Sequence, residues 1–246
     1  VADVARRAES RGFSVIQEHP GYEAPVERFG MLSPGPQLAL ELLSGPPPVR
    51  YWFLNPAGDE LLQLQPNWLA ANWRKVTPSD VYGRWESRWD AFVSWVQDVE
   101  FVLTPQRPLQ HDQVEVTYIN HIEGAGVWSE HGDAARVFSF LGHHGGTHLR
   151  SPEGIVSQMS FTMSAGPGSP AGRLHVTVTP AFKRPKNEPI FVMNLTARGA
   201  PAGPTLDGVK AFADLAHEWI VRGFTDLTTS GMHQAWKRTD QGGVPE

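Results

Sequence analysis

The strongest constraint on the fold is an alternation of polar and apolar side chains in three segments, residues 114–121, 174–179 and 190–198. Successive residues of a strand point to opposite faces, so a period of two predicts strands with one buried face and one solvated face. Antiparallel sheets commonly show this division. The alternation therefore predicts an antiparallel sheet in the second half of the chain.

Further strands are expected throughout the sequence, because its 24 glycines and 21 prolines are scattered in a way that indicates tight turns between short elements. Strand-like runs cover residues 13–18, 51–65 as a hairpin, 68–73 and 155–163. Gly- and Pro-containing links of hairpin size join the later strands, which favours antiparallel order. The Gly- and His-rich stretch 122–153 predicts irregular loops with an edge strand near 137–141.

Helices are expected where apolar residues recur at spacings of three and four. The expected helices cover residues 2–11 with Gly12 as the stop, 37–43, a long stretch after the N-cap candidate Ser79, 206–223, and a short piece capped by Thr229 or Ser230. The apolar stripe of the helix over 206–223 consists of Val209, Phe212, Ala213, Ala216, Trp219 and Ile220. Such a stripe predicts packing on the sheet.

Together these elements predict an α+β fold, a large curved antiparallel sheet with long helices packed on one face as a two-layer sandwich. Each half runs through three strands into a long helix, which indicates a pseudo-repeat of two β-β-β-α halves. A chain of 246 residues that is 40% apolar can bury a core without disulfides or metals. We expect a single domain, 1–246, with intimate halves 1–122 and 123–246.

Composition excludes several classes of site. The sequence has no cysteine, which excludes disulfides, thiolate nucleophiles and cysteine-ligated metals and favours a reducing cytoplasm. We expect neither export nor membrane insertion, because residues 1–7 lack an apolar signal core and no run approaches the roughly 18 apolar residues of a membrane span. The net charge of −5 does not favour nucleic-acid binding, and Lys183–Lys186 is expected to be a solvated hairpin loop.

A candidate binding face follows from the alternation. The polar residues opposite the apolar sides of the three strands should share one open face: Glu115, Thr117, His121, His175, Thr177, Thr179, Asn194, Thr196 and Arg198. The simpler interpretation is the wet side of a half-covered sheet. The functional interpretation is a shallow groove in which Arg198 binds an anion and His121 or His175 carries a proton.

Metal and cofactor motifs are weak or missing. Residues 143–148, His-His-Gly-Gly-Thr-His, superficially resemble a metal cluster, but adjacent strand histidines point to opposite faces and the glycines prevent the helical spacing that lets two histidines share a metal. We expect a polar loop there. The sequence has no dinucleotide-binding, Walker, nucleophile-elbow or zinc-protease motif, so we assign no catalytic residue, metal or cofactor.

Several motifs resemble one family. They are Leu61-Leu-Gln-Leu-Gln-Pro-Asn with Asn72-Trp-Arg-Lys75, Val114-Glu-Val-Thr-Tyr-Ile-Asn-His-Ile122, Leu195-Thr-Ala-Arg-Gly199, and Phe224-Thr-Asp-Leu-Thr-Thr with Met232-His-Gln-Ala-Trp236. Over residues 50–238 the chain resembles an uncharacterised, sporadically distributed family of bacterial proteins. The resemblance implies accessory genes such as defence or toxin–antitoxin loci and brings no established activity. The N-terminal segment departs from the family pattern, in which members open with a strand.

These observations predict a non-catalytic binding or adaptor protein that engages a protein partner. The first alternative is an enzyme that acts on a small anionic substrate with a histidine and Arg198 on the open face. The second is a nucleic-acid binder, which needs a basic stripe of Arg74, Lys75, Lys183, Arg184 and Arg198. A homodimer through an uncovered sheet edge is compatible with the pattern.

Overall fold

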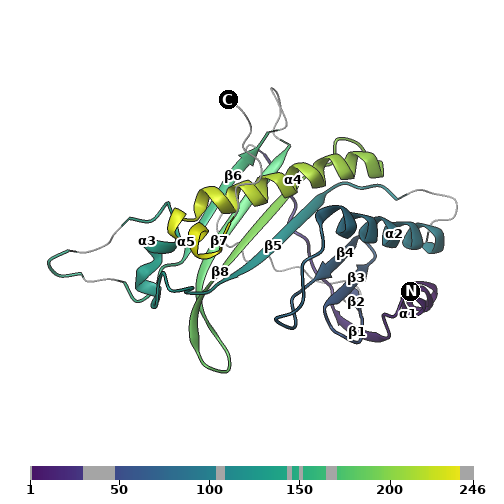
Figure 1. The fold of residues 1–246 in the computed structure, drawn as a ribbon. Coiled ribbons are helices and arrows are strands. Elements are labelled where there is room, and N and C mark those ends of the chain that lie inside the picture. Colours follow the sequence, from purple (N-terminus) through teal and green to yellow (C-terminus); the bar gives the residue numbers. More distant parts are fainter. Residues whose placement is uncertain are drawn as a thin grey trace. The chain divides into compact units, whose positions relative to one another are not determined.

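A computed structural model describes residues 2–29, 48–103, 109–142, 146–149, 152–164 and 171–238 of the chain. The chain forms two compact units, residues 1–110 and 111–246, each with a four-stranded antiparallel sheet (Figure 1). The predicted α+β class with antiparallel strands is confirmed. The single large sheet is corrected to two sheets, because the described strands of each unit pair only with one another.

The first unit is a meander with two helices. Its elements are α1 (Ala2–Ser10), β1 (Val15–Pro20), β2 (Val49–Leu54), β3 (Glu60–Gln65), β4 (Trp68–Trp73) and α2 (Trp85–Leu103). The strand order β1-β2-β3-β4 follows the chain, since each strand pairs with the next one. Gly12, just after α1, has a φ of 88°, which is the left-handed conformation that favours glycine at a helix end.

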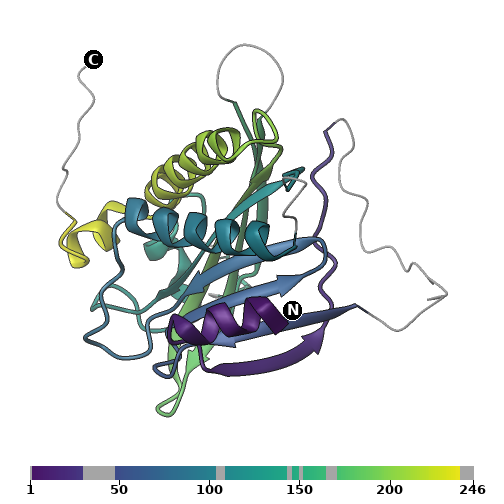
Figure 2. The same cartoon turned by 90° about the vertical axis from the view of Figure 1, so that its right-hand side faces the viewer.

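Both helices of the first unit cover the same face of its sheet, as Figure 2 shows. The core between these layers consists of Val4, Ala8, Phe13, Phe53, Leu62, Leu64, Trp95 and Val99. Strand β3 contributes Leu62 and Leu64, as its alternation predicts. The expected wet face of β3 is wrong, because Gln63 and Gln65 are buried too. The Gln65 side chain exchanges two hydrogen bonds with the backbone of Tyr22, and the Gln63 side chain donates to Asn72.

The long helix of the first unit begins later than Ser79. Helix α2 starts at Trp85, and Asp80 instead closes a turn by accepting hydrogen bonds from the N–H groups of Val76 and Thr77 and from the Thr77 hydroxyl. An aspartate offers the backbone an alternative to helix in this way. These hydrogen bonds, the one from the Thr77 side chain first, hold the pKa of Asp80 below its ordinary value of 3.8.

The second unit has a different strand order. Its elements are β5 (Val114–Ile122), the 3₁₀ helix η1 (His131–Asp133), α3 (Ala134–Val137), β6 (Ser157–Met163), β7 (Gly172–Lys183), β8 (Glu188–Gly199), α4 (Leu206–Leu227) and α5 (Ser230–Ala235). The order is β5-β8-β7-β6, so β5 pairs with the last strand and not with the next one. The expected pseudo-repeat is not confirmed, and β5, expected in the first half, belongs to the second unit.

Helix α4 covers one face of the second sheet (Figure 1). Its predicted stripe is confirmed, with Phe212, Ala216 and Ile220 buried against apolar residues of β7 and β8. The helix approaches closely at its N-terminal end, where a Cβ at Gly199 would lie 2.6 Å from the Phe212 ring. A hydrogen bond also joins β5 to α4, because the Tyr118 hydroxyl lies 2.9 Å from Nδ1 of His217.

The expectations for three further segments have different outcomes. The edge strand expected near 137–141 is wrong, because α3 ends at Val137 and only Phe138 forms a bridge, to Thr228. The hairpin loop at Lys183–Lys186 is confirmed between β7 and β8. The helix expected at 37–43 lies outside the described residues.

None of the described helices combines the length and the apolar character needed to span a membrane.

Removing the Phe191 ring should test the core of the second unit. Phe191 is fully buried, with its ring centroid 4.8 Å from that of Trp128 and 5.1 Å from that of Phe138. We expect Phe191→Ala to lower the free energy of unfolding by about 3–5 kcal/mol. Val221→Ala on α4, 46% exposed, should change it by less than about 0.5 kcal/mol. Urea denaturation measures both values, and equal losses would contradict the assigned core.

The turn closed by Asp80 should depend on pH. Its lowered pKa means that the turn gains stability from the carboxylate, present above the ordinary value of 3.8 and lost as pH falls through the lowered pKa. We expect the amide proton resonances of Val76 and Thr77 to shift upfield over that acidic range, as measured by NMR. In Asp80→Ala the same resonances should already lie upfield at neutral pH, and unchanged resonances would rule out these hydrogen bonds.

Candidate functional site

The strand register of the second unit builds one polar surface. Residues paired across antiparallel strands point to the same side of the sheet, and Arg198 is paired with both Glu115 and Arg173, while Thr196 is paired with both Thr117 and His175. The resulting polar face consists of Glu115, Thr117, Ile119 and His121 on β5, Val192, Asn194, Thr196 and Arg198 on β8, Arg173, His175, Thr177 and Thr179 on β7, and Gln158, Ser160 and Thr162 on β6. Every residue assigned to the open face from the sequence lies on it.

The polar face points away from α4. The alternate residues of the same strands, such as Leu174, Val176 and Leu195, form the core with that helix. No residue of the polar face belongs to this core, and Ile119 in the middle of β5 is 64% exposed. An antiparallel sheet with one covered face can leave its other face to solvent or to a partner.

Side chains on the polar face bind one another across the strands. Arg198 donates from Nε to Oε2 of Glu115 over 2.7 Å. In the next row the hydroxyl oxygens of Thr117 and Thr196 lie 3.0 Å apart. The Arg198 side chain is only 13% exposed, so its charge is largely removed from water and is balanced by Glu115. These contacts hold one end of the face, near the start of β5 and the end of β8, in a defined arrangement.

The register separates His121 from Arg198 on this face. His121 is six positions from Glu115 along β5, so it lies roughly 20 Å from the Glu115–Arg198 pair. His175 is nearer, in the row next to Arg198, at a backbone separation of roughly 8 Å. Because Glu115 already accepts from the guanidinium, the arrangement offers a paired cation rather than an open anion site.

Ser160 is a member of the polar face that the sequence analysis missed. Its Oγ lies 3.1 Å from Nδ1 of His175, a distance at which a histidine can polarise a hydroxyl. The sequence contains a pattern that indicates this position, because Met159, Phe161 and Met163 alternate with polar residues along β6.

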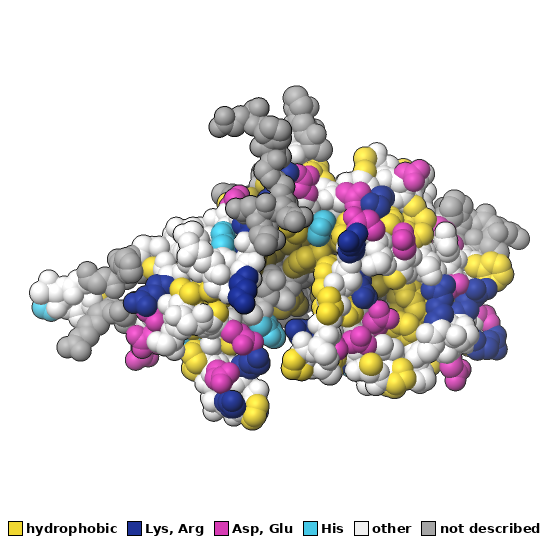
Figure 3. Space-filling model, in the orientation of Figure 1, with side chains coloured by type: hydrophobic (Ala, Val, Ile, Leu, Met, Phe, Trp, Pro, Cys, Tyr) yellow, Lys and Arg dark blue, Asp and Glu magenta, His cyan; other side chains and the backbone are white. Residues whose placement is uncertain are grey.

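Basic side chains do not form a free stripe in the described parts of the chain. Arg74 donates to the carbonyl of Gly58, and Arg198 is paired with Glu115. The Lys183 ammonium lies 2.5 Å from the Glu123 carboxylate, which raises the pKa of Lys183 above its ordinary value. In Figure 3, Lys and Arg side chains lie among Asp and Glu side chains. The charges give no support to the nucleic-acid alternative.

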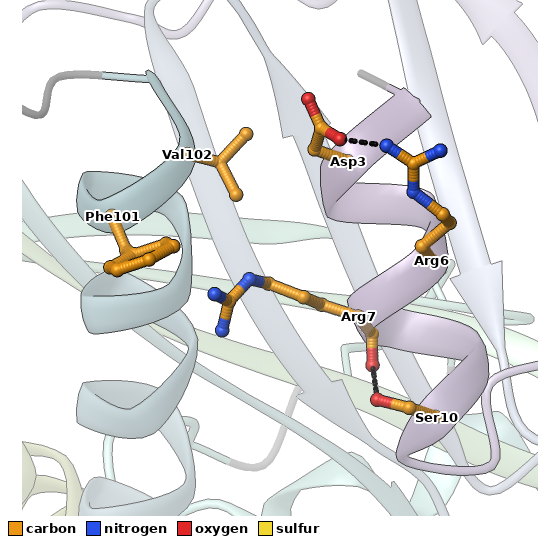
Figure 4. Close-up of a pocket in the computed structure, with 6 residues that line it drawn as sticks. All are labelled: Asp3, Arg6, Arg7, Ser10, Phe101 and Val102. Carbon is orange, nitrogen blue, oxygen red and sulfur yellow. Dashed lines mark hydrogen bonds and ion pairs between the residues drawn. The ribbon is translucent and has the colours of Figure 1, made fainter.

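A hollow of about 400 Å³ in the first unit lies between α1 and α2 (Figure 4). Arg7 points across it, with its guanidinium 4.3 Å from the centre of the Phe101 ring. Arg7 also donates to Asp98 over 2.8 Å, and Arg11 pairs with the other oxygen of Asp98 at 2.6 Å. Because Asp98 is buried, these contacts fasten α1 to α2, and we assign the hollow a structural role.

Metal ligands are not grouped in the described part of the chain. Among these residues no set of three or more His, Asp or Glu side chains could hold a metal ion. Of the histidine-rich segment, His148 lies in the described stretch 146–149 and is exposed, whereas His143 and His144 lie outside the described residues. The absence of a metal stays a prediction.

Comparisons with known proteins identify no relative. The sequence matches no protein-family model, and no curated protein or solved structure is significantly similar to it. The resemblance to a sporadically distributed bacterial family therefore stays a prediction, as does a role for the polar face.

The Glu115–Arg198 pair should contribute measurably to stability. Glu115→Gln leaves the mostly buried guanidinium without its counter-charge, so we expect the free energy of unfolding to fall by about 1 kcal/mol. The matched control is Glu218→Gln on α4, which removes an ion pair with Arg222 whose side chains are at least half exposed. This control should lose less than about 0.5 kcal/mol. Equal values in urea denaturation would mean that solvent screens both pairs alike.

Proposed function

We propose that the chain is a non-catalytic binding or adaptor protein that engages a protein partner through the polar face. The observation that carries the proposal is the set of cross-strand contacts, Glu115 with Arg198, Thr117 with Thr196 and Ser160 with His175. Side chains that are already ordered lose less entropy when a partner binds. A preformed surface of this kind favours recognition.

The composition of the polar face also suits a protein partner. Ile119 is 64% exposed and is paired with Asn194, while Val192 on β8 lies in the next row. Protein interfaces combine an apolar centre with a polar, hydrogen-bonding surround. We propose that Ile119 is the apolar anchor and that the paired polar residues align the partner around it.

The biological setting is part of the same proposal. The motifs shared with a sporadically distributed bacterial family support an accessory locus of the defence or toxin–antitoxin type. The cysteine-free sequence is compatible with a reducing cytoplasm. Strands β5 and β6 are the outer strands of the second sheet. Two copies of the chain can therefore pair through one of these edges as a homodimer.

Native mass spectrometry of the chain purified gently from its own host tests the proposal. We expect an excess mass that matches a second polypeptide. Ile119→Asp should reduce the bound fraction in titrations with that polypeptide by raising the dissociation constant at least about ten-fold. The matched control is Val221→Asp, an exposed aliphatic residue on α4, which should leave the dissociation constant unchanged.

Two results would overturn this function. A bare chain, or a complex that Ile119→Asp does not weaken, would remove the polar face as the binding surface. A small-molecule mass, together with turnover of an anionic substrate that Ser160→Ala and His175→Ala abolish, would favour the enzyme alternative instead.

A further inference from the structure

A second hollow, of about 460 Å³, lies in the second unit beside the β7–β8 hairpin. It is lined by Ser129, Glu130, His131, Gly132, Pro152, Glu153, Phe182 and Pro189. No lysine or arginine is among these residues, and neither glutamate side chain has an ion-pair or hydrogen-bond partner among the residues that the structure describes. The hollow thus combines two carboxylates with the Phe182 ring, which is 61% exposed.

Two walls of this hollow are held by contacts within the unit. His131 is buried, and its Nε2 lies 3.1 Å from the carbonyl oxygen of Ala181 and 3.0 Å from that of Ile190, which are paired residues of β7 and β8. The neighbouring Ser129 N–H donates to Asp133 over 3.1 Å. These contacts hold the loop that carries Glu130 against the hairpin that carries Phe182.

The basic residue next to Phe182 in the sequence does not neutralise the hollow. Lys183 follows Phe182 in β7, but its ammonium is engaged by Glu123 at 2.5 Å. The imidazole of His131 packs against Phe182 with a centroid distance of 5.0 Å and is committed to the two backbone carbonyls. A cation that enters therefore meets an aromatic ring and two carboxylates that none of the described residues neutralises.

We propose that this hollow binds the guanidinium group of an arginine side chain on a protein partner. A guanidinium can bond to carboxylates and stack on the exposed Phe182 ring at the same time, and its weak hydration lowers the cost of entering a partly enclosed site. Pro152 and Pro189 offer apolar surface to the arginine stem. An anion would be repelled by Glu130 and Glu153. This inference rests on the proposed function, because a protein partner supplies the arginine.

The test uses the full chain and the neutral-ended probe N-acetyl-arginine amide, followed by ¹H–¹⁵N NMR. We expect saturable shifts at the amides of Gly132, Glu153 and Phe182, with a dissociation constant on the order of millimolar for an isolated side chain. The double variant Glu130→Gln, Glu153→Gln should raise this constant at least ten-fold. N-acetyl-lysine amide should bind the unmodified chain several-fold more weakly, since an ammonium cannot stack as a guanidinium does.

The matched control is Glu218→Gln on α4, which removes one exposed carboxylate outside the hollow and should leave the shifts unchanged. The inference is overturned if no saturable shift occurs at about ten times the expected dissociation constant, or if the double variant, still folded by its spectrum, binds the probe as well as the unmodified chain. Equal binding of the two probes would show attraction to charge alone and would also overturn it.

The same variants separate this inference from the proposed function. A complex that Ile119→Asp weakens, in a chain that does not bind the arginine probe, would leave the polar face as an interface and remove the arginine site. Probe binding without any protein complex would keep the site and remove the protein partner as its source of arginine.

Discussion

The packing of α4 on one face of the second sheet decides where a functional surface can lie in that unit. Phe212, Ala216 and Ile220 bury the apolar side of β7 and β8, and burial of such area is the main favourable term in folding. Gly199 lets the helix approach, because a side chain there would collide with Phe212. Once the helix takes the apolar side, strand alternation leaves the polar side facing outward.

The polar face and the acidic hollow are built by different means. The polar face follows from register, since each row is a set of paired residues such as Thr117, Thr196 and His175. The hollow is built by loops, and Glu130, Glu153 and Phe182 come from three segments far apart in the sequence. Contacts within the protein hold the polar face, and they hold the loop of Glu130 and the hairpin of Phe182 in the hollow.

In the first unit, buried polar contacts join segments that are distant in the sequence. Asp98 accepts a hydrogen bond from Arg7 and forms an ion pair with Arg11, and thereby joins α2 to α1. Gln65 exchanges hydrogen bonds with the backbone of Tyr22 and joins that segment to β3. A buried charge or amide is costly when it is left without a partner, so these pairs fix the position of the segments they join.

The sequence by itself determined the elements whose pattern is local. Alternation located β5, β7 and β8 and identified nine residues of the polar face, and the 3.6-residue period predicted the buried stripe of α4 within Leu206–Leu227. Only the tertiary structure decided that β5 pairs with β8, that Gln65 is buried, and that Glu130 and Phe182 share a hollow. The physical reason is that side-chain direction follows from the backbone period, whereas pairing and burial depend on distant segments that no local pattern records.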